Sequence, residues 1–155
     1  MARPAQEVVR IAVLNGPSLN LLGSREPEIY GRATLGDIET RLRIVADEIG
    51  AEVEFAQHNG EGELIDRIHA MRGTTDGALI NAGAYTHTSL AIRDALAAVD
   101  VPFVEVHLTN IFAREAERRH SMLASAATAV LCGFGALGYE LALRGLVAKL
   151  AAPSA

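Results

Sequence analysis

Five short apolar runs, separated by longer amphipathic segments, make up most of the chain. Each run is bounded by turn-forming residues, as a buried β-strand is, and the five cover residues 8–14, 52–56, 77–81, 102–106 and 127–132. Several segments between and after them carry apolar side chains three and four positions apart, as one face of a helix does. This spacing predicts helices over residues 35–49, 63–71, 89–99 and 136–150.

Strands that alternate with helices imply a parallel sheet covered on both faces, with right-handed crossovers. We therefore predict an α/β fold, a flavodoxin-like doubly wound five-stranded parallel sheet with helices on both faces. One domain would span residues 1–155, with a short disordered tail at about 151–155. Thr34 and Thr88 stand before helical segments and are expected to be N-caps, and Gly50 is expected to end the first helix.

Polar side chains gather in the segments that follow the expected strands. These segments hold four of the five histidines and most of the asparagines; they are NGPSLNLLGSREPEIYG, QHNGEG, NAGAYTHTS, HLTNIFAREAERRHS and GFGALG. In a parallel sheet, such segments meet outside the carboxyl ends of the strands, where ligands bind. A domain without a ligand would spread these residues over both edges. The sequence therefore predicts a polar small-molecule site.

Composition disfavours several functions. A formal net charge of −5 argues against a nucleic-acid binder, whose surface should be basic. The sequence has neither an apolar run near the ~20 residues of a membrane span nor a signal peptide core, so we expect a cytoplasmic protein. The single cysteine, Cys132, excludes an internal disulfide and is expected in the core. The single lysine, Lys149, lies near the C-terminal end, which disfavours Schiff-base catalysis.

Two motifs are weaker than they look. Gly133, Gly135 and Gly138 spell the dinucleotide fingerprint G-x-G-x-x-G, but no later strand supplies the acidic residue that holds the ribose. We expect these glycines to serve close packing of a helix on the sheet. The histidines lack the spacing to carboxylates that metal motifs require, so no metal site is expected.

His107 and Glu105 form a more specific pair. They are two residues apart on an expected strand, so both side chains point to the same face. Charged and titratable residues are unusual in a strand that is buried on both faces. A carboxylate beside an imidazole orients its tautomer and raises its basicity, as a proton donor requires. We predict a working role for His107.

Tyr30 follows Arg25 by five residues, at the end of a polar segment. A phenol has a pKa near ~10, so it acts as a base at neutral pH only if a cation stabilises the phenolate. A guanidinium ~4 Å away supplies roughly 4 kcal/mol at an effective dielectric of 20. Arg25, Arg114 and Arg118 could each provide it. The residues alone leave open whether Tyr30 is a base or only packs its ring.

Three long segments resemble one family of enzymes. LNGPSLNLLGSREPEIYG, NAGAYTHTSLAIRDAL and FVEVHLTNIFAREAERRHS are similar, in this order, to the motif blocks of the type II 3-dehydroquinate dehydratases. The similarity runs from about residue 8 to 150. It implies the flavodoxin-like fold, a homododecamer built from trimers, and neither metal nor organic cofactor. It also implies anti elimination of water from 3-dehydroquinate, through an enolate, to give 3-dehydroshikimate.

The resemblance implies roles for four catalytic residues. Tyr30 would take the proton from the carbon next to the ketone, and Arg25 would stabilise the phenolate. His107 would protonate the departing hydroxyl, with Glu105 behind it. The segment over about residues 20–31 would be a lid, whose closure over the substrate brings the base into place and excludes water.

The resemblance also implies a binding site for the substrate carboxylate, formed by Asn81 and the backbone N–H groups of Leu108 and Thr109. Thr109 stands where serine is common in the family, which keeps the hydroxyl. Ser18 stands where the family usually has asparagine, in NGPNLN. That asparagine is thought to order a water near the tyrosine and the enolate, so Ser18 puts the rate of turnover in question.

Ring hydroxyls of the substrate would bind to His87, Arg118 and Asp94, the last reaching across a subunit boundary. Arg114 would belong to the same rim. An alternative function is a non-catalytic flavodoxin-like domain that binds a small molecule, and Ser18 is its main support. The sequence does not distinguish the shikimate pathway, which leads to chorismate and aromatic amino acids, from quinate breakdown, because both use this reaction.

Overall fold

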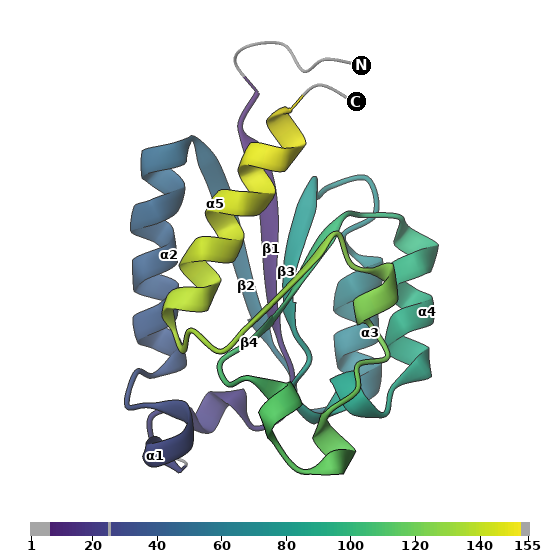
Figure 1. Ribbon diagram of the computed structural model, residues 1–155. Coiled ribbons are helices and arrows are strands. Elements are labelled where there is room, and N and C mark those ends of the chain that lie inside the picture. Colours follow the sequence, from purple (N-terminus) through teal and green to yellow (C-terminus); the bar gives the residue numbers. More distant parts are fainter. Residues whose placement is uncertain (1–6, 25, 153–155) are drawn as a thin grey trace.

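Five parallel strands form one sheet in the computed structural model, which describes residues 7–24 and 26–152. The strands are β1 (Val9–Asn15), β2 (Ala51–Gln57), β3 (Gly77–Asn81), β4 (Phe103–His107) and β5 (Ala129–Cys132). Their order in the sheet is β2-β1-β3-β4-β5, and all neighbouring pairs are parallel. The predicted doubly wound, flavodoxin-like sheet is confirmed (Figure 1).

Four long helices cover the two faces of the sheet (Figure 1). One face carries α2 (Leu35–Ile49) and α5 (Leu137–Ala151), and the other carries α3 (Glu61–His69) and α4 (Leu90–Val99). The side chains of β1 alternate between the two layers. Ile11 and Val13 join the core under α2 and α5, whereas Ala12 and Leu14 join the core under α3 and α4. Burial on both faces explains why the central strands are continuous apolar runs.

Short helical turns shape the loops between the strands and the long helices. They are α1 (Pro27–Tyr30) and the 3₁₀ turns η1 (Leu19–Leu21), η2 (Gly83–His87), η3 (Ile111–Ala113), η4 (Ala116–Arg118) and η5 (Ala124–Ala126). All of them lie in connections that leave the carboxyl ends of strands, and η5 comes last in its connection, just before β5. The polar residues of these loops are therefore held by local structure.

The caps of two helices differ in how well the sequence predicted them. Thr34 caps α2 in a capping box with Asp37, and Gly50 ends the helix with a φ of 73°, both as predicted. The predicted cap at Thr88 is wrong, because the Ser89 hydroxyl accepts the N–H of Ile92 at 2.9 Å. Ser89 has the extended backbone of an N-cap, whereas Thr88 still belongs to the end of η2.

β5 is an edge strand and is more exposed than the other strands. Ala129 and Val130 are exposed, and Cys132 is only half-buried. The expectation that Cys132 lies in the core is therefore wrong, because an apolar run does not distinguish an edge strand from a central one. Close packing is confirmed for Gly138, where a Cβ would lie 3.0 Å from Leu131 Cδ2. It is wrong for Gly135, where a Cβ would meet nothing within 4 Å and a φ of 62° accounts for the glycine instead.

The predicted elements begin and end within two residues of the observed ones. The tail was expected at about residues 151–155, but Ala151 still belongs to α5, and 153–155 lie outside the described residues. The expected place of Arg25 also falls outside them. Within residues 7–24 and 26–152, no helix combines the length and the apolar character needed to cross a membrane.

Candidate active site

The loops at the carboxyl edge of the sheet surround a pocket of about 170 Å³. Its walls come from the loops after β1, β3 and β4. Nine of the residues expected at the site line it: Ser18, Tyr30, Asn81, His87, His107, Leu108, Thr109, Arg114 and Arg118. The parallel topology thus brings segments that are far apart in the sequence to one place.

Two of the expected site residues that the structure describes do not line the pocket. Glu105 is fully buried and lies behind His107. Asp94 is exposed on α4, outside the pocket of this chain. Arg25 lies outside the described residues, so its expected place beside Tyr30 stays a prediction.

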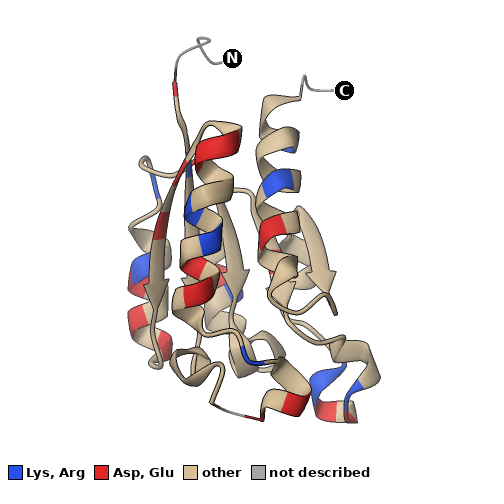
Figure 2. Cartoon of the chain, turned by 90° about the vertical axis from the view of Figure 1, so that its left-hand side faces the viewer, with Lys and Arg blue, Asp and Glu red and all other residues tan. Residues whose placement is uncertain are grey.

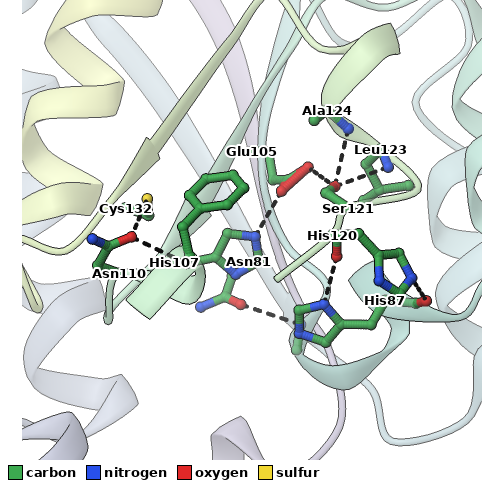
Figure 3. Close-up of polar contacts among 12 residues, drawn as sticks. Asn81, His87, Glu105, His107, Asn110, His120, Ser121, Leu123, Ala124 and Cys132 are labelled. Atoms are coloured by element: carbon green, nitrogen blue, oxygen red, sulfur yellow. Dashed lines mark hydrogen bonds and ion pairs between the residues drawn. The ribbon is translucent and has the colours of Figure 1, made fainter. Parts of the chain in front are cut away.

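The first chemical feature of the pocket is the pair of His107 and Glu105 at the end of β4. Val104 and Val106 point into the core under α2 and α5, so the two alternate residues point to the other face. His107 Nε2 lies 2.7 Å from Glu105 Oε2, and the two residues are 5% and 0% exposed (Figure 3). If Nε2 donates to the carboxylate, Nδ1 is left as the ring nitrogen that can serve a ligand.

His87 is fixed by a reciprocal contact with His120. His87 Nδ1 lies 2.7 Å from the carbonyl oxygen of His120, and His120 Nε2 lies 2.7 Å from the carbonyl oxygen of His87. Burial lowers the pKa of His87 below its ordinary value, the bond to His120 opposes this, and the nearby His107 and Arg118 add to the lowering. A neutral His87 donates from Nδ1 and keeps Nε2 as an acceptor, which suits a hydroxyl group of a ligand.

A buried polar network holds Asn81. Asn81 Nδ2 donates to the hydroxyl of Tyr139 at 2.9 Å, and this hydroxyl donates to Asn15 Oδ1 at 2.5 Å. Tyr139 is fully buried, and burial raises its pKa well above the ordinary value, so it stays a neutral donor. Tyr139 and Asn15 were not predicted from the sequence as site residues. The one available signal was that Asn15 and Asn81 end two neighbouring strands, where they pair in register.

Tyr30 is in contact with an arginine from another loop. Arg114 Nη1 donates to the Tyr30 hydroxyl at 3.1 Å, and the guanidinium carbon lies 5.6 Å from the ring centroid. The bond to Tyr30 raises the pKa of Arg114 above its ordinary value. Of the arginines considered for this position, Arg114 is therefore the one that the described residues bring to the phenol.

Acidic neighbours orient the arginines after β4. Arg118 Nε donates to Glu115 Oε1 at 2.5 Å, and Arg114 Nε lies 3.6 Å from Glu115 Oε2. Figure 2 shows this mixture of basic and acidic residues at the carboxyl edge of the sheet. Because Glu115 is half-exposed, it can orient both guanidinium groups without filling the pocket.

Ser18 occupies a backbone position that few residues favour. Its φ is 67°, in the left-handed region, where asparagine is tolerated better than serine. Its N–H donates to Asn59 Oδ1 at 3.0 Å, and Gln57 Nε2 donates to the same oxygen at 3.0 Å. Asn59, whose side chain holds this turn, was not predicted from the sequence.

The pocket combines a phenol next to a guanidinium with a buried imidazole–carboxylate pair. These groups can remove a proton from one atom and deliver a proton to another. Among the described residues, no group of three histidine, cysteine, aspartate or glutamate side chains could hold a metal ion. Fold and site together define an α/β protein equipped for acid–base chemistry.

Known proteins are similar to this chain in sequence. Residues 9–147 match the model of the family Dehydroquinase class II. The 3-dehydroquinate dehydratase of Gemmatimonas aurantiaca is 62% identical over 140 residues, which cover 90% of this chain and 92% of that protein. Catabolic 3-dehydroquinase 2 of Aspergillus flavus is 55% identical, over 86% of this chain and 89% of that protein. The chain belongs to the class II dehydroquinase family.

A solved structure supports the same assignment. The type II dehydroquinase from Propionibacterium acnes superposes with a TM-score of 0.86 and is 41% identical. The similarity covers 92% of this chain and 99% of that structure. Both the family and the sheet expected from the sequence are thereby confirmed.

Proposed function

We propose that this pocket catalyses the removal of water from 3-dehydroquinate to give 3-dehydroshikimate. Relatives that match over most of the chain are named 3-dehydroquinate dehydratase. The observation that carries the proposal is the Tyr30–Arg114 contact in the same pocket as the buried His107–Glu105 pair. A base and an acid in one pocket are what the two proton transfers of this elimination need.

Tyr30 is the proposed base. Its phenolate removes the proton from the carbon next to the ketone, and the electron pair of that C–H bond forms an enolate. Arg114 stabilises the phenolate through the contact of 3.1 Å. A cation at ~4 Å supplies roughly 4 kcal/mol at an effective dielectric of 20. Arg25 would add to this effect, as the family resemblance implies.

His107 is the proposed acid. The enolate collapses, the carbon–oxygen bond breaks, and the departing hydroxyl takes a proton from the imidazolium and leaves as water. Glu105, 2.7 Å from Nε2, orients the ring and supports its positive charge. The donor is then Nδ1, the ring nitrogen that the carboxylate does not occupy.

The remaining pocket residues are the proposed substrate contacts. Asn81 uses one amide hydrogen for Tyr139, so its second is available for the substrate carboxylate, which the N–H groups of Leu108 and Thr109 also bind. His87 and Arg118 bind ring hydroxyls, and Ser18 borders the reacting atoms. Asp94, exposed on α4, is proposed to enter the pocket of a neighbouring subunit.

Residues 1–155 are proposed to form one catalytic domain that works in the cytoplasm as a homododecamer built from trimers, with residues 20–31 as the lid. The exposed place of Asp94 supports a shared site. Light scattering at micromolar concentration should then give a mass far above that of a trimer. A stable, fully active monomer would contradict this assembly.

The activity itself is tested directly. Purified protein is mixed with 3-dehydroquinate, and the ultraviolet absorbance of the conjugated enone product is followed with time. We expect absorbance to grow with enzyme concentration and without added metal or cofactor. Binding of 3-dehydroquinate without any product would favour the alternative, a non-catalytic binding domain, which the names of the relatives do not favour.

A further inference from the structure

We propose that Ser121 is a positioning residue for the proton donor. In this arrangement its hydroxyl holds the carboxylate of Glu105 charged and oriented, so that Glu105 can hold His107. The inference rests on the proposed role of His107 and extends the pair into a chain of three residues. Ser121 does not line the pocket, so it acts through Glu105 and has no contact of its own with a bound ligand.

The direction of the serine hydroxyl is determined by its neighbours. Ser121 Oγ accepts the backbone N–H groups of Leu123 and Ala124, each at 3.0 Å. Both donors approach the oxygen, so the hydroxyl proton has to point elsewhere. It points to Glu105 Oε1, 2.5 Å away (Figure 3). The result is a chain in which the backbone donates to Ser121 and Ser121 donates to Glu105.

The carboxylate depends on this donor. Glu105 is 0% exposed, and within the described residues its hydrogen bonds come from Ser121 on one oxygen and His107 on the other. A buried carboxylate is costly unless its oxygens are hydrogen-bonded. If the serine hydroxyl is removed, Oε1 loses its one printed hydrogen bond among the described residues. The carboxylate can then turn away from its contact with His107 Nε2, and the ring loses the partner that orients it.

The backbone around Ser121 is held independently of its hydroxyl. Met122 N donates to the carbonyl of Thr86 at 2.7 Å, and His120 Nε2 contacts the carbonyl of His87. Leu123 is fully buried in the core under α3 and α4. Removal of the hydroxyl should therefore leave the segment in place and change mainly the state of Glu105.

The test compares four variants at Ser121 and at a matched control position. Ser121→Ala removes the hydroxyl, Ser121→Cys keeps the volume but donates weakly, and Ser121→Thr keeps the donor. Ser125→Ala is the control, because Ser125 is an exposed serine in η5. For each folded variant, kcat and KM for 3-dehydroquinate are measured from the enone absorbance.

We expect kcat to fall roughly 10- to 100-fold in Ser121→Ala and Ser121→Cys, with KM within about 2-fold, because a hydrogen bond to a charged group is lost. Ser121→Thr and Ser125→Ala should keep most of the activity. If Ser121→Ala fails to fold, Ser121→Cys decides. Wild-type kcat in either variant, or a folded Ser121→Thr as slow as they are, would overturn the proposal.

Two further measurements separate this inference from the proposed function. In a Glu105→Gln background, Ser121→Ala should add less than about 2-fold to the loss of kcat, because both changes break one chain. The ring ¹⁵N resonances of His107 should move in Ser121→Ala and stay in Ser125→Ala, whether or not turnover occurs. If the resonances move but the wild-type protein itself shows no turnover, the positioning role of Ser121 stands and the proposed dehydratase activity is refuted. Unchanged resonances would refute the role of Ser121.

Discussion

The proposed acid and the proposed base belong to very different parts of the molecule. His107 and Glu105 end β4, a strand in which all five residues are buried. Tyr30 ends α1, a four-residue helix with no buried residue, which lies between Glu26 with a φ of 42° and Gly31 with a φ of 82°. Strands in a core open rarely, whereas short surface turns open at little cost. The proposed acid therefore lies in the buried sheet, while the proposed base lies on a short surface turn, as the proposed lid over residues 20–31 requires.

The largest loss of kcat is expected when the proposed base, Tyr30, is changed. Tyr30→Phe removes the proton acceptor but keeps the ring, so kcat should fall at least roughly 100-fold while substrate still binds. The enone assay measures the loss of kcat, and calorimetry measures whether 3-dehydroquinate still binds. Tyr85→Phe is a control, because the Tyr85 hydroxyl contacts only the carbonyl of Asn59 in the described chain. More than a tenth of wild-type kcat in Tyr30→Phe would remove Tyr30 from the mechanism.

Removal of the proposed acid, His107, should lower kcat by a similar or slightly smaller factor than removal of the base. His107→Ala removes the donor to the leaving hydroxyl, and kcat should fall roughly 100-fold with a much smaller change in KM. His69→Ala, on the exposed side of α3, serves as the control. The chemical step should then limit the turnover of His107→Ala, so kcat of this variant should not depend on solvent viscosity. Normal turnover of His107→Ala would be incompatible with the proposed acid.

A pH titration should distinguish His87 from the base and the acid. Its pKa is lowered in the folded protein, so protonation is disfavoured there relative to the unfolded chain. Stability is then full above the ordinary pKa of ~6.5 and is lost as pH falls from that value through the lower folded one. KM should rise by roughly 10-fold over the same window, because Nε2 stops accepting. The melting temperature and KM of the wild-type and His87→Gln proteins are measured from pH 7.5 to 5. If both quantities change with pH equally in the two proteins, the role of His87 is contradicted.

The smallest effect is expected at Ser18, on the loop side of the comparison. A φ of 67° suits asparagine better than serine, so Ser18→Asn should stabilise the fold by about 1 kcal/mol or less. It should also leave kcat/KM equal or raise it up to roughly 2- to 10-fold, if an amide orders the catalytic water. Ser24→Asn in the same loop should change neither the stability of the fold nor kcat/KM. A fall of more than tenfold with unchanged assembly would mean that the loops have adapted to serine.

The sequence predicted what local patterns determine. Thr34 and Gly50 mark the ends of α2, because a cap acts within one turn of its own helix. The choice between Thr88 and Ser89 was not predictable, since the two residues are chemically similar and the packing of η2 decides it. Glu105 and His107 could be paired because a strand brings alternate residues to one face.

Side-chain contacts between residues far apart in the chain could not be predicted from the sequence. Arg114 and Tyr30 are 84 positions apart, and Tyr139 and Asn15 are 124 apart. Sequence periodicity does not show which distant residues are in contact, so the sequence left three arginines as possible partners of Tyr30. Ser121 was missed for the same reason, because its partner Glu105 lies on a strand that the serine itself does not belong to.

The bond from Tyr139 to Asn15 also bears on how the enzyme matures. Tyr139 lies near the start of α5, the last helix in the described chain, whereas Asn15 ends the first strand. A ribosome delivers the amino-terminal part first. The sheet can begin to assemble, yet the amide of Asn81 lacks its anchor until α5 has emerged and docked. Completion of the site is therefore a late event in biogenesis, and a nascent chain that is stalled before α5 should lack both the anchor of Asn81 and the cover of one sheet face.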